Sequence, residues 1–241
     1  CKGWLAVGNI LFRHTVDGGM AIFRHGTEAQ KDYFLPGLIK GDIKFCLSMS
    51  EPNAGSDAAA ITTTAVMDGD DYIINSGKVF TTGIDIATHI QLATLTDKTR
   101  RKGEGISVFL VDTSTPGITK RKIEKLCNKT MTTFEVHYDN VRVPEENMLG
   151  ELNQGWRNIF KVLDFERLCV AAMCNGVSQA ALEDPTEYAK ERVQFGRPIS
   201  KFQAIQHKLV DMYMRVNASR LLIYQAVWQL EQNASAPLEC S

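Results

Sequence analysis

A carboxylate lies within an apolar helical stripe in the last third of the chain. Glu166 follows Leu163 by three residues and precedes Val170 by four, and residues at these spacings share one face of a helix. Burial raises the pKa of a carboxyl group, which suits a general base near neutral pH. On these residues alone we favour the alternative, in which Glu166 pairs with Arg167 or with a neighbouring helix.

A loop of small and hydroxyl residues spans 48–57, with the sequence SMSEPNAGSD, and follows a predicted strand. Small residues let a backbone approach a flat or charged ligand closely, and hydroxyl groups supply hydrogen bonds without charge. Ser, Asn and Gly are also the ordinary residues of surface loops. Taken alone, the segment is therefore more often a plain loop than a binding site.

Two further segments combine aromatic and polar side chains. The run KVFTTG at 78–83 follows a strand, and its aromatic residue beside hydroxyls could flank an aromatic cofactor; the alternative is an ordinary strand end. The run ERVQFGRP at 191–198 lies between two predicted helices, where Gly and Pro make a turn. Arg192 could hold a phosphate and Phe195 could stack on a base, although a charged interhelical loop is the alternative.

The elements that must position these residues begin with a helical section, residues 1–43. Its first apolar face is formed by Leu5, Val7, Ile10 and Leu11. Thr27 and Gln30 fit a capping box, in which a hydroxyl and an amide satisfy the free N–H groups at a helix start. This helix runs toward Phe34. We expect Pro36 to stop or kink it, because proline removes a donor and clashes with the preceding turn.

Residues 44–152 are rich in predicted strands. The expected strands are Thr62–Val66, Tyr72–Ile74, His89–Leu95, Ile106–Val111, Ile118–Ile123 and Phe134–Tyr138. The turn DGDD at 68–71 predicts a hairpin between the first two. Frequent turn residues between short strands are typical of a β-sandwich or barrel. The absence of strand–helix–strand alternation and of a G-x-G-x-x-G motif argues against a Rossmann sheet.

Two long helices are predicted after residue 153. The first runs from near Gly155 to near Arg192, and Pro185 should kink or break it. Its apolar face consists of Ile159, Leu163, Val170 and Met173. The second helix begins with a capping box at Ser200 and Gln203 and reaches about Leu230. Its apolar stripe consists of Phe202, Ile205, Leu209, Met212 and Val216.

The composition of the chain argues against nucleic-acid binding, a metal site and a membrane-spanning segment. The formal net charge of −1 gives no electrostatic argument for nucleic-acid binding. The six cysteines form no C-x-x-C pair and no histidine lies at a metal-ligand spacing, so we predict no metal site and a reducing, cytoplasmic compartment. No apolar stretch of about 18 residues is present to span a membrane. Because the chain has no initiating Met, we expect a fragment or a numbering that starts inside a longer protein.

A series of short motifs runs through the chain. In order they are HGT at 25–27, LP at 35–36, SEPNAGSD at 50–57, NSGK at 75–78, TG at 82–83, PG at 116–117, DNVRVP at 139–144, GW at 155–156, ER at 166–167, YAKERVQFG at 188–196 and FQAIQ at 202–206. The S-E-P-x-A-G-S-D and R-x-x-F-G motifs are highly specific. With these motifs the chain resembles the acyl-CoA dehydrogenase family over essentially its whole length.

The resemblance implies an α+β multidomain fold. Its parts would be the end of an N-terminal helical domain over 1–43, a middle β-barrel or sandwich domain over 44–152, and an incomplete C-terminal bundle of long helices over 153–241. FAD would lie between the β-domain and the C-terminal helices of a homotetramer. In a eukaryote the compartment would be the mitochondrial matrix.

The resemblance also implies roles for individual residues. The flavin would be lined by Met49, Ser50, Phe80, Thr81 and Thr82. Ser50 and Thr82 would hydrogen-bond near its reactive end, and Ser56 would contact the FAD phosphate close to the CoA arm. The FAD of a neighbouring subunit would be reached by Arg192, Gln194, Phe195 and Gln203. Asp164 and Arg167 would contact the CoA part of the substrate.

The implied reaction is FAD-dependent oxidation of the Cα–Cβ bond of an acyl-CoA thioester, or the reverse reduction. A carboxylate removes the α-proton, the β-hydrogen leaves as hydride to flavin N5, and electrons typically pass to electron-transfer flavoprotein. Many family members place the base near the C-terminus, in a region absent from this chain. Others place it on the long helix directly before an Arg, the position of Glu166, and the resemblance makes Glu166 the favoured base.

The branch of the family is less sharply indicated. The pattern is similar to the isovaleryl- and long-chain-type enzymes and to the crotonobetainyl-CoA reductase-like branch, the last most of all. Ser50 and Asn53 stand where Thr and Gly are common in the family. The alternatives to a dehydrogenase are an acyl-CoA oxidase, which passes electrons to oxygen, and an inactive truncated paralogue with a structural role.

Overall fold

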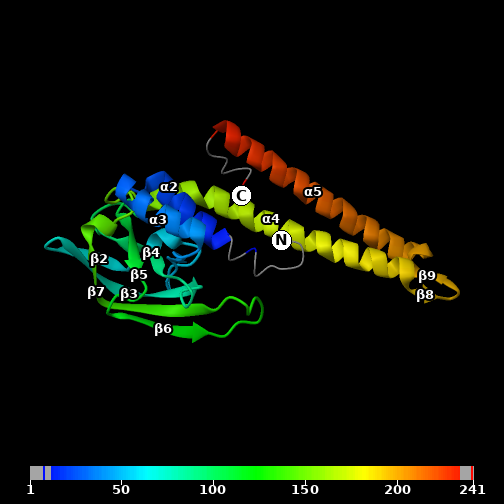
Figure 1. Ribbon diagram of the computed structural model, residues 1–241, viewed down its shortest axis with the longest axis horizontal. Helices are drawn as coiled ribbons and strands as arrows, with labels where there is room; N and C mark the ends of the chain where they lie inside the picture. The colour runs from blue at the N-terminus through cyan, green and yellow to red at the C-terminus, as the bar shows by residue number, and fades with distance from the viewer. Residues whose placement is uncertain (1–7, 9–11, 234–239, 241) are drawn as a thin grey trace. The chain divides into compact units, whose positions relative to one another are not determined.

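The computed structural model of the protein describes residue 8, residues 12–233 and residue 240 (Figure 1). The chain divides into two compact units, the first ending at Leu163 and the second beginning at Asp164. The predicted apolar face of Leu5, Val7, Ile10 and Leu11 lies outside the described residues. The first unit groups the helices before residue 43 with the strands that follow them.

Three helical segments precede the strands. They are the π-helix η1 (Arg13–Met20), α2 (Ala21–His25) and α3 (Glu28–Lys40). The predicted capping box at the start of α3 is confirmed. The Gln30 N–H donates to Thr27 Oγ1 over 3.2 Å, and the Thr27 N–H donates to Gln30 Oε1 over 3.1 Å.

Of the two effects predicted for Pro36, the stop is wrong, because α3 continues to Lys40, and the kink stays a prediction. A tertiary contact holds the turn before the proline, and local capping bonds close the turn after it. Phe34 is buried with its ring 5.4 Å from that of Phe45. Beyond the proline, the N–H groups of Gly41 and Asp42 donate to carbonyls of the last turn. Gly41 has a φ of 81°, the left-handed conformation that ends helices at glycine.

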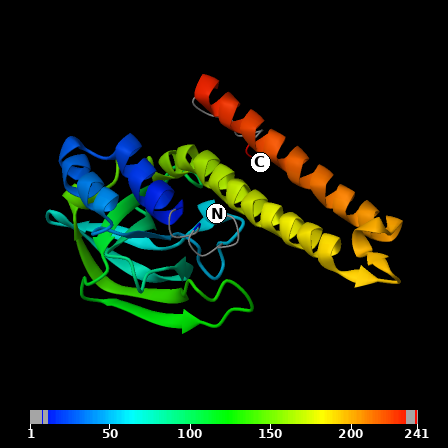
Figure 2. The same ribbon diagram turned by 45° about the vertical axis from the view of Figure 1, so that its right-hand side comes forward.

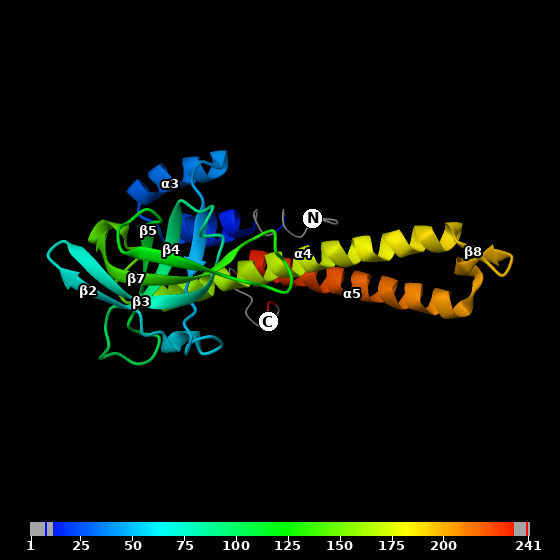
Figure 3. The ribbon, with the colours of Figure 1, turned by 90° about the horizontal axis from the view of Figure 1, so that it is seen from below.

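Seven strands form the sheet of the first unit. They are β1 (Phe45–Ser48), β2 (Thr64–Asp68), β3 (Asp71–Thr82), β4 (His89–Leu95), β5 (Ile106–Asp112), β6 (Ile118–Ile123) and β7 (Thr133–Pro144). Their order is β1-β4-β2-β3-β7-β6, with β5 paired to β4. Figure 3 shows β2, β3 and β7 side by side. The bounds predicted for β4 and β6 are confirmed, as is the β2–β3 hairpin across the turn at 68–71.

The strands β3 and β7 are longer than predicted. Residues 78–82 belong to β3, whereas the sequence placed them after a strand, and there they pair with Thr133–Val136 of β7. The local pattern did not show this extension, because the hydrogen-bonding partner lies more than fifty residues away. Side chains such as Ile74, Leu92, Phe109 and Val136 fill the core between the strands and are fully buried.

The second unit is built on two long helices. α4 (Gly155–Glu191) enters it at Asp164, and α5 (Gln203–Asn233) runs antiparallel to α4 (Figure 2). The two are joined by the short strands β8 (Val193–Gln194) and β9 (Arg197–Pro198) and the turn η4 (Ile199–Lys201). Side chains tie the helices together: Asn175 Nδ2 donates to the Val216 carbonyl over 2.9 Å, and Arg220 Nη2 donates to Gln179 Oε1 over 2.7 Å.

Three local predictions for these helices are corrected. α4 is not broken at Pro185: the buried side chains of Leu182 and Ala189 anchor it on either side. The predicted capping box fails, because Ser200 lies in η4, where backbone hydrogen bonds replace the cap, and Gln203 is the first residue of α5. Val170 is 39% exposed, since a single partner helix covers only a narrow stripe of α4.

The predicted stripe of α5 is confirmed. Val216 is buried, and Ile205, Leu209 and Met212 are partly covered, as is Phe202 directly before the helix. The covered face continues through Ile223 to the buried Ala226 and Leu230. None of the helices searched within the described residues is long and apolar enough to cross a membrane. The described part of the chain also holds no group of three or more acidic, His or Cys side chains that could bind a metal ion.

Candidate active site

A buried carboxylate anchors the polar loop that follows β1. Glu51 is 5% exposed and accepts hydrogen bonds from the backbone N–H and the hydroxyl of Thr62, at 2.7 and 2.8 Å, and from both groups of Thr63. Burial by itself would raise the pKa of Glu51. The hydrogen bonds from Thr63 and the charge of Lys78 outweigh burial and lower that pKa to about 2.

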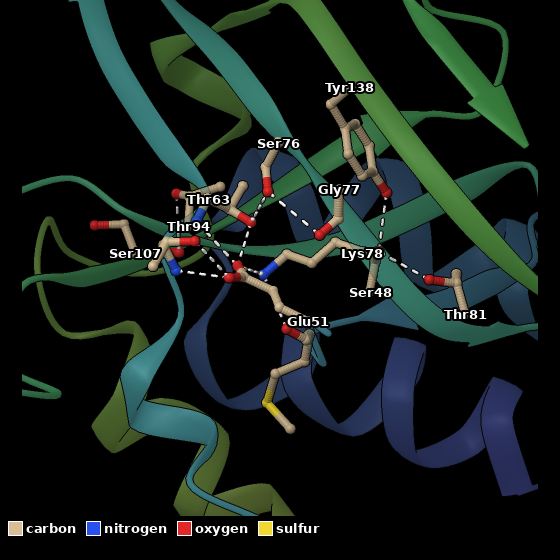
Figure 4. Close-up of polar contacts among 12 residues, drawn as sticks. Ser48, Glu51, Thr63, Ser76, Gly77, Lys78, Thr81, Thr94, Ser107 and Tyr138 are labelled. Carbon is tan, nitrogen blue, oxygen red and sulfur yellow. Dashed lines mark hydrogen bonds and ion pairs between the residues drawn. The ribbon is translucent and has the colours of Figure 1, made fainter. Parts of the chain in front are cut away.

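Lys78 of β3 is the partner of Glu51 and is completely buried. Its ammonium donates to Glu51 Oε1 over 2.9 Å and to the Met49 carbonyl over 2.8 Å (Figure 4). Burial lowers the pKa of Lys78 to about 8, although the charge of Glu51 opposes this shift. Both groups are therefore charged at neutral pH.

The ion pair fixes the loop to the strand. The Val79 N–H donates to the Ser50 carbonyl over 2.8 Å, directly beside the bond between Lys78 and Met49. Met49 and Ser50, which we predicted at the flavin, thus lie against the end of β3. The sequence did not reveal the roles of Glu51, Lys78 and Thr63. A lysine in a run of strand-forming residues was the one available signal, and its pairing depends on a contact across 27 residues.

A second buried network lies next to this pair. The Tyr138 hydroxyl donates to Ser48 Oγ over 2.9 Å, and Ser48 Oγ lies 3.0 Å from Thr81 Oγ1. Burial raises the pKa of the Tyr138 hydroxyl above its usual range. Thr81 as a whole is completely buried, backbone and side chain alike, so its side chain serves this network rather than an exposed surface.

The neighbours of Thr81 have the opposite orientation. Phe80 is 65% exposed and has a φ of 60°, a conformation that is strained for an aromatic residue. The ladder between β3 and β7 is irregular at this point, between Lys78 and Thr81. Thr82 is partly exposed, with its Oγ1 3.0 Å from Thr133 Oγ1. The irregularity presents an aromatic ring and a hydroxyl at the strand end.

Ser56 lies further along the same loop and is exposed. Its neighbour Asp57 forms an ion pair with Lys102 on the surface. Ser56 is thus accessible to solvent, and no contact within the described residues fixes its hydroxyl. Its contact with an FAD phosphate stays a prediction.

In the second unit, Asp164, Glu166 and Arg167 lie within one turn of α4. Asp164 is 4% exposed, and its Oδ1 lies 3.7 Å from Arg167 Nη1. Glu166 is partly buried. Burial raises the pKa of the Cys169 thiol, and the charge of Glu166, three residues earlier on the helix, adds to this effect.

An apolar cavity of about 360 Å³ lies between α4 and α5. Phe165 and Cys169, which flank Glu166 in the sequence, contribute to its wall, and Ile223 and Val227 of α5 face them. Glu166 itself does not belong to this lining, because successive residues of a helix point about 100° apart.

The turn between the helices carries the remaining predicted residues. Phe195 at its tip is 92% exposed with a φ of 50°, and its ring centroid lies 6.1 Å from that of Phe202. Arg192 and Gln203 are also exposed. The Arg192 guanidinium makes no ion pair with any described residue. The turn therefore offers a free cation and an exposed ring, a donor set that fits a phosphate-bearing aromatic ligand.

The structure thus collects the predicted residues into groups within each unit. Met49, Ser50, Phe80 and Thr82 gather at the end of β3 in the first unit. Asp164, Glu166 and Arg167 lie on one turn of α4, and Arg192, Gln194 and Phe195 lie in one hairpin of the second unit.

Sequence comparison matches both units to one family. Residues 46–141 match the family "Acyl-CoA dehydrogenase, middle domain", and residues 153–241 match "Acyl-CoA dehydrogenase, C-terminal domain". The chain is 40% identical over 217 residues to the 3-(aryl)acrylate reductase of Clostridium sporogenes, covering 90% of this chain and 57% of that protein. It is 38% identical over 224 residues to the caffeyl-CoA reductase–Etf complex subunit CarC of Acetobacterium woodii, covering 92% of this chain and 59% of that protein.

Comparison with solved structures indicates the same family. The butyryl-CoA dehydrogenase structure from Megasphaera elsdenii superimposes with a TM-score of 0.93 at 37% identity, covering 98% of this chain and 62% of that chain. The chain therefore spans somewhat more than half the length of the relatives it matches. Because its two matched domains follow in order and its fold agrees with that of butyryl-CoA dehydrogenase, the chain belongs to the acyl-CoA dehydrogenase family.

Proposed function

We propose that the protein oxidises the Cα–Cβ bond of an acyl-CoA thioester with FAD, or catalyses the reverse reduction. The observation that carries this proposal is the end of β3, where a buried ion pair holds Met49 and Ser50 beside the exposed Phe80 and Thr82. A flat ring with polar edges fits a surface that combines an aromatic side chain, hydroxyls and backbone groups.

The proposed cofactor contacts use both units. Met49, Ser50, Phe80 and Thr82 would line the flavin ring, with the buried Thr81 behind them, and Ser56 would approach a phosphate. The phosphates and adenine of an FAD bound by a neighbouring subunit would be held by Arg192, Gln194, Phe195 and Gln203. When bound, FAD supplies the acceptor for hydride, which no amino-acid side chain can provide. This arrangement makes a homotetramer part of the proposal.

Glu166 is the proposed base for the proton α to the thioester. Its position on the long helix directly before Arg167 supports this role, because some members of the family carry the base at this place. Arg167 pairs with Asp164 rather than serving only as a counter-ion of Glu166. Asp164 and Arg167 are proposed to bind the CoA part of the substrate and to hold the helix turn that carries the base.

The proposals for the direction of the reaction and for the electron-transfer partner are based on the similar proteins. Two of the similar proteins are named as reductases, one of them as a subunit of a complex with Etf, and the third is a butyryl-CoA dehydrogenase. We therefore propose electron-transfer flavoprotein as the redox partner and an acyl-CoA or its enoyl counterpart as the substrate.

An anaerobic titration tests this function. The purified protein is titrated with butyryl-CoA and other acyl-CoAs while the flavin absorption is recorded, in the wild type, in Glu166→Gln and in a control, Glu187→Gln. Glu187 is an exposed carboxylate on the same helix. We expect one thioester to bleach the flavin in the wild type and the control, and Glu166→Gln to slow this by at least 100-fold.

The other outcomes identify the alternatives. Bleaching that survives in Glu166→Gln moves the base to a carboxylate outside these residues. Fast reoxidation of the reduced protein by air indicates an acyl-CoA oxidase. A protein that stays colourless after FAD is added is an inactive paralogue, and the proposed activity is then wrong.

A further inference from the structure

The Lys78 ammonium binds the peptide group that joins Met49 and Ser50. Its Nζ lies 2.8 Å from the carbonyl oxygen of Met49, and the N–H on the other side of this peptide belongs to Ser50. The Ser50 carbonyl already accepts the Val79 N–H over 2.8 Å. Among the described residues no acceptor for the Ser50 N–H is found, so this donor is available to a ligand.

A cation bonded to a peptide oxygen polarises the whole peptide. Electron density moves toward the oxygen, the N–H becomes more positive, and a hydrogen bond that it donates becomes stronger. The effect is large where water cannot screen the charge, and Lys78 is completely buried. Glu51 holds the ammonium in place at 2.9 Å and balances its charge at longer range.

We propose that Lys78 is a positioning residue that acts through the Met49–Ser50 peptide to strengthen the Ser50 N–H as a donor to bound flavin, and that it thereby raises the flavin's reduction potential. This inference rests on the proposed function. Reduction adds negative charge to the flavin ring, so a more positive donor at the ring edge stabilises the reduced form more than the oxidised form. The ion pair thus changes the reduction potential of the flavin without contacting the flavin directly.

The test is the two-electron reduction potential of the FAD-loaded, full-length protein. The test variant combines Lys78→Met with Glu51→Gln, so that no unpaired charge is left in the interior. The control is Glu51→Gln alone, with all three proteins compared at each pH from about 7 down to 5, because loss of the Glu51 charge lowers the pKa of Lys78 further and its ammonium is retained at the acidic end. In the double variant we expect the preference for reduced over oxidised FAD to fall about ten-fold, which is about 30 mV for two electrons. The control should keep most of the wild-type potential.

Two results would overturn the inference. One is an equal potential in all three proteins. The other is an equal fall of the potential in the control and the double variant. This would mean that the conformation of the loop, and not the charge of Lys78, sets the potential.

A backbone variant covers the case in which the double variant does not fold. Replacing Ser50 by its α-hydroxy acid turns the 49–50 amide into an ester, which removes the N–H donor and leaves Lys78 and Glu51 in place. Its potential should fall as well, and an unchanged potential contradicts the inference. Wild-type protein that binds no FAD contradicts the proposed function itself, whereas FAD binding with unshifted potentials contradicts only the role of Lys78.

Discussion

At the scale of single residues, the chemistry of the first unit depends on charges hidden from water. A buried ion pair gains little net stability, because desolvation offsets most of its attraction, but removing one partner leaves an uncompensated charge. Glu51 and Lys78 avoid this cost through the hydroxyls and N–H groups of Thr62 and Thr63 and the carbonyl of Met49. Such pairs hold local geometry, and here the geometry is that of the loop beside β3.

The lowered pKa of Glu51 predicts an acid-dependent stability. Its pKa is about 2 in the folded protein against 4.5 ordinarily, so the unfolded chain binds more protons between these values. The stabilisation is present above about pH 4.5 and is lost as the pH falls toward 2. Urea unfolding should show the difference between the wild type and Glu51→Gln shrinking over this range by on the order of 2 kcal/mol. The exposed Glu104→Gln should show no such trend; a constant difference for Glu51→Gln would contradict the prediction.

The lowered pKa of Lys78 predicts a change in stability in the alkaline pH range. Because its pKa is about 8 when folded and 10.5 ordinarily, the unfolded chain again binds more protons between these values. The free energy of unfolding should therefore gain a contribution from Lys78 as the pH rises from 8 to 10.5. The Lys78→Met/Glu51→Gln variant should lack this contribution in urea unfolding at each pH, and parallel curves for the two proteins would contradict it.

Tyr138→Phe tests the second buried network. The change removes the donor to Ser48 Oγ, which keeps its contact with Thr81, so we expect a loss of about 1 kcal/mol in the free energy of unfolding. Tyr224→Phe on the exposed face of α5 is the control and should have no effect. Equal effects in urea unfolding would mean that the Tyr138 hydroxyl contributes nothing.

At the scale of elements, proline is tolerated where packing holds the helix on both sides. Pro36 and Pro185 both lie inside continuous helices. Local preference disfavours this by about 3 kcal/mol, and buried neighbours such as Phe34, Leu182 and Ala189 compensate for it. Propensity indicates where a helix is weak, and tertiary contacts decide whether it ends there.

Pro185→Ala should stabilise the second unit. Alanine restores the N–H that proline lacks and removes the clash with the preceding turn, so we expect the free energy of unfolding to rise by about 1–3 kcal/mol. Asp184→Ala, at the exposed neighbouring position, should change it by less than about 0.5 kcal/mol. No gain in urea unfolding for Pro185→Ala would show that α4 is already adapted to the proline.

At the scale of the whole molecule, the proposed cofactor site depends on assembly. The exposed Arg192 and Phe195 of the hairpin have few partners within their own unit. Exposed, strained residues at a turn are typical of contacts made with a ligand or another subunit.

Arg192→Ala should weaken FAD binding. Loss of a charge-assisted bond to a phosphate is expected to lower the affinity about ten-fold or more in calorimetric titration, without a change in thermal stability of the FAD-free protein. Arg215→Ala on α5, where the side chain pairs with Asp211, is the matched control. An affinity that does not change in Arg192→Ala would contradict binding to the FAD of a neighbouring subunit.

The sequence by itself determined the family, the order of helices and strands, and the edges of elements with local signals. The Thr27 cap, the turn at 68–71 and the strands β4 and β6 followed from contacts within a few residues. The motifs also indicated Met49, Ser50 and Glu166, whose proposed roles remain predictions. Spacing and residue type were sufficient because these features depend on near neighbours along the chain.

Only the tertiary structure decided what depends on distant partners. The extension of β3 needed β7, the continuity of α3 and α4 needed packing around their prolines, and the inward orientation of Thr81 needed Ser48 and Tyr138. The pairing of Lys78 with Glu51 joins two residues that a local pattern cannot connect. A buried charge is stable only where folding brings its hydrogen-bonding partners together, and that condition is a property of the folded chain.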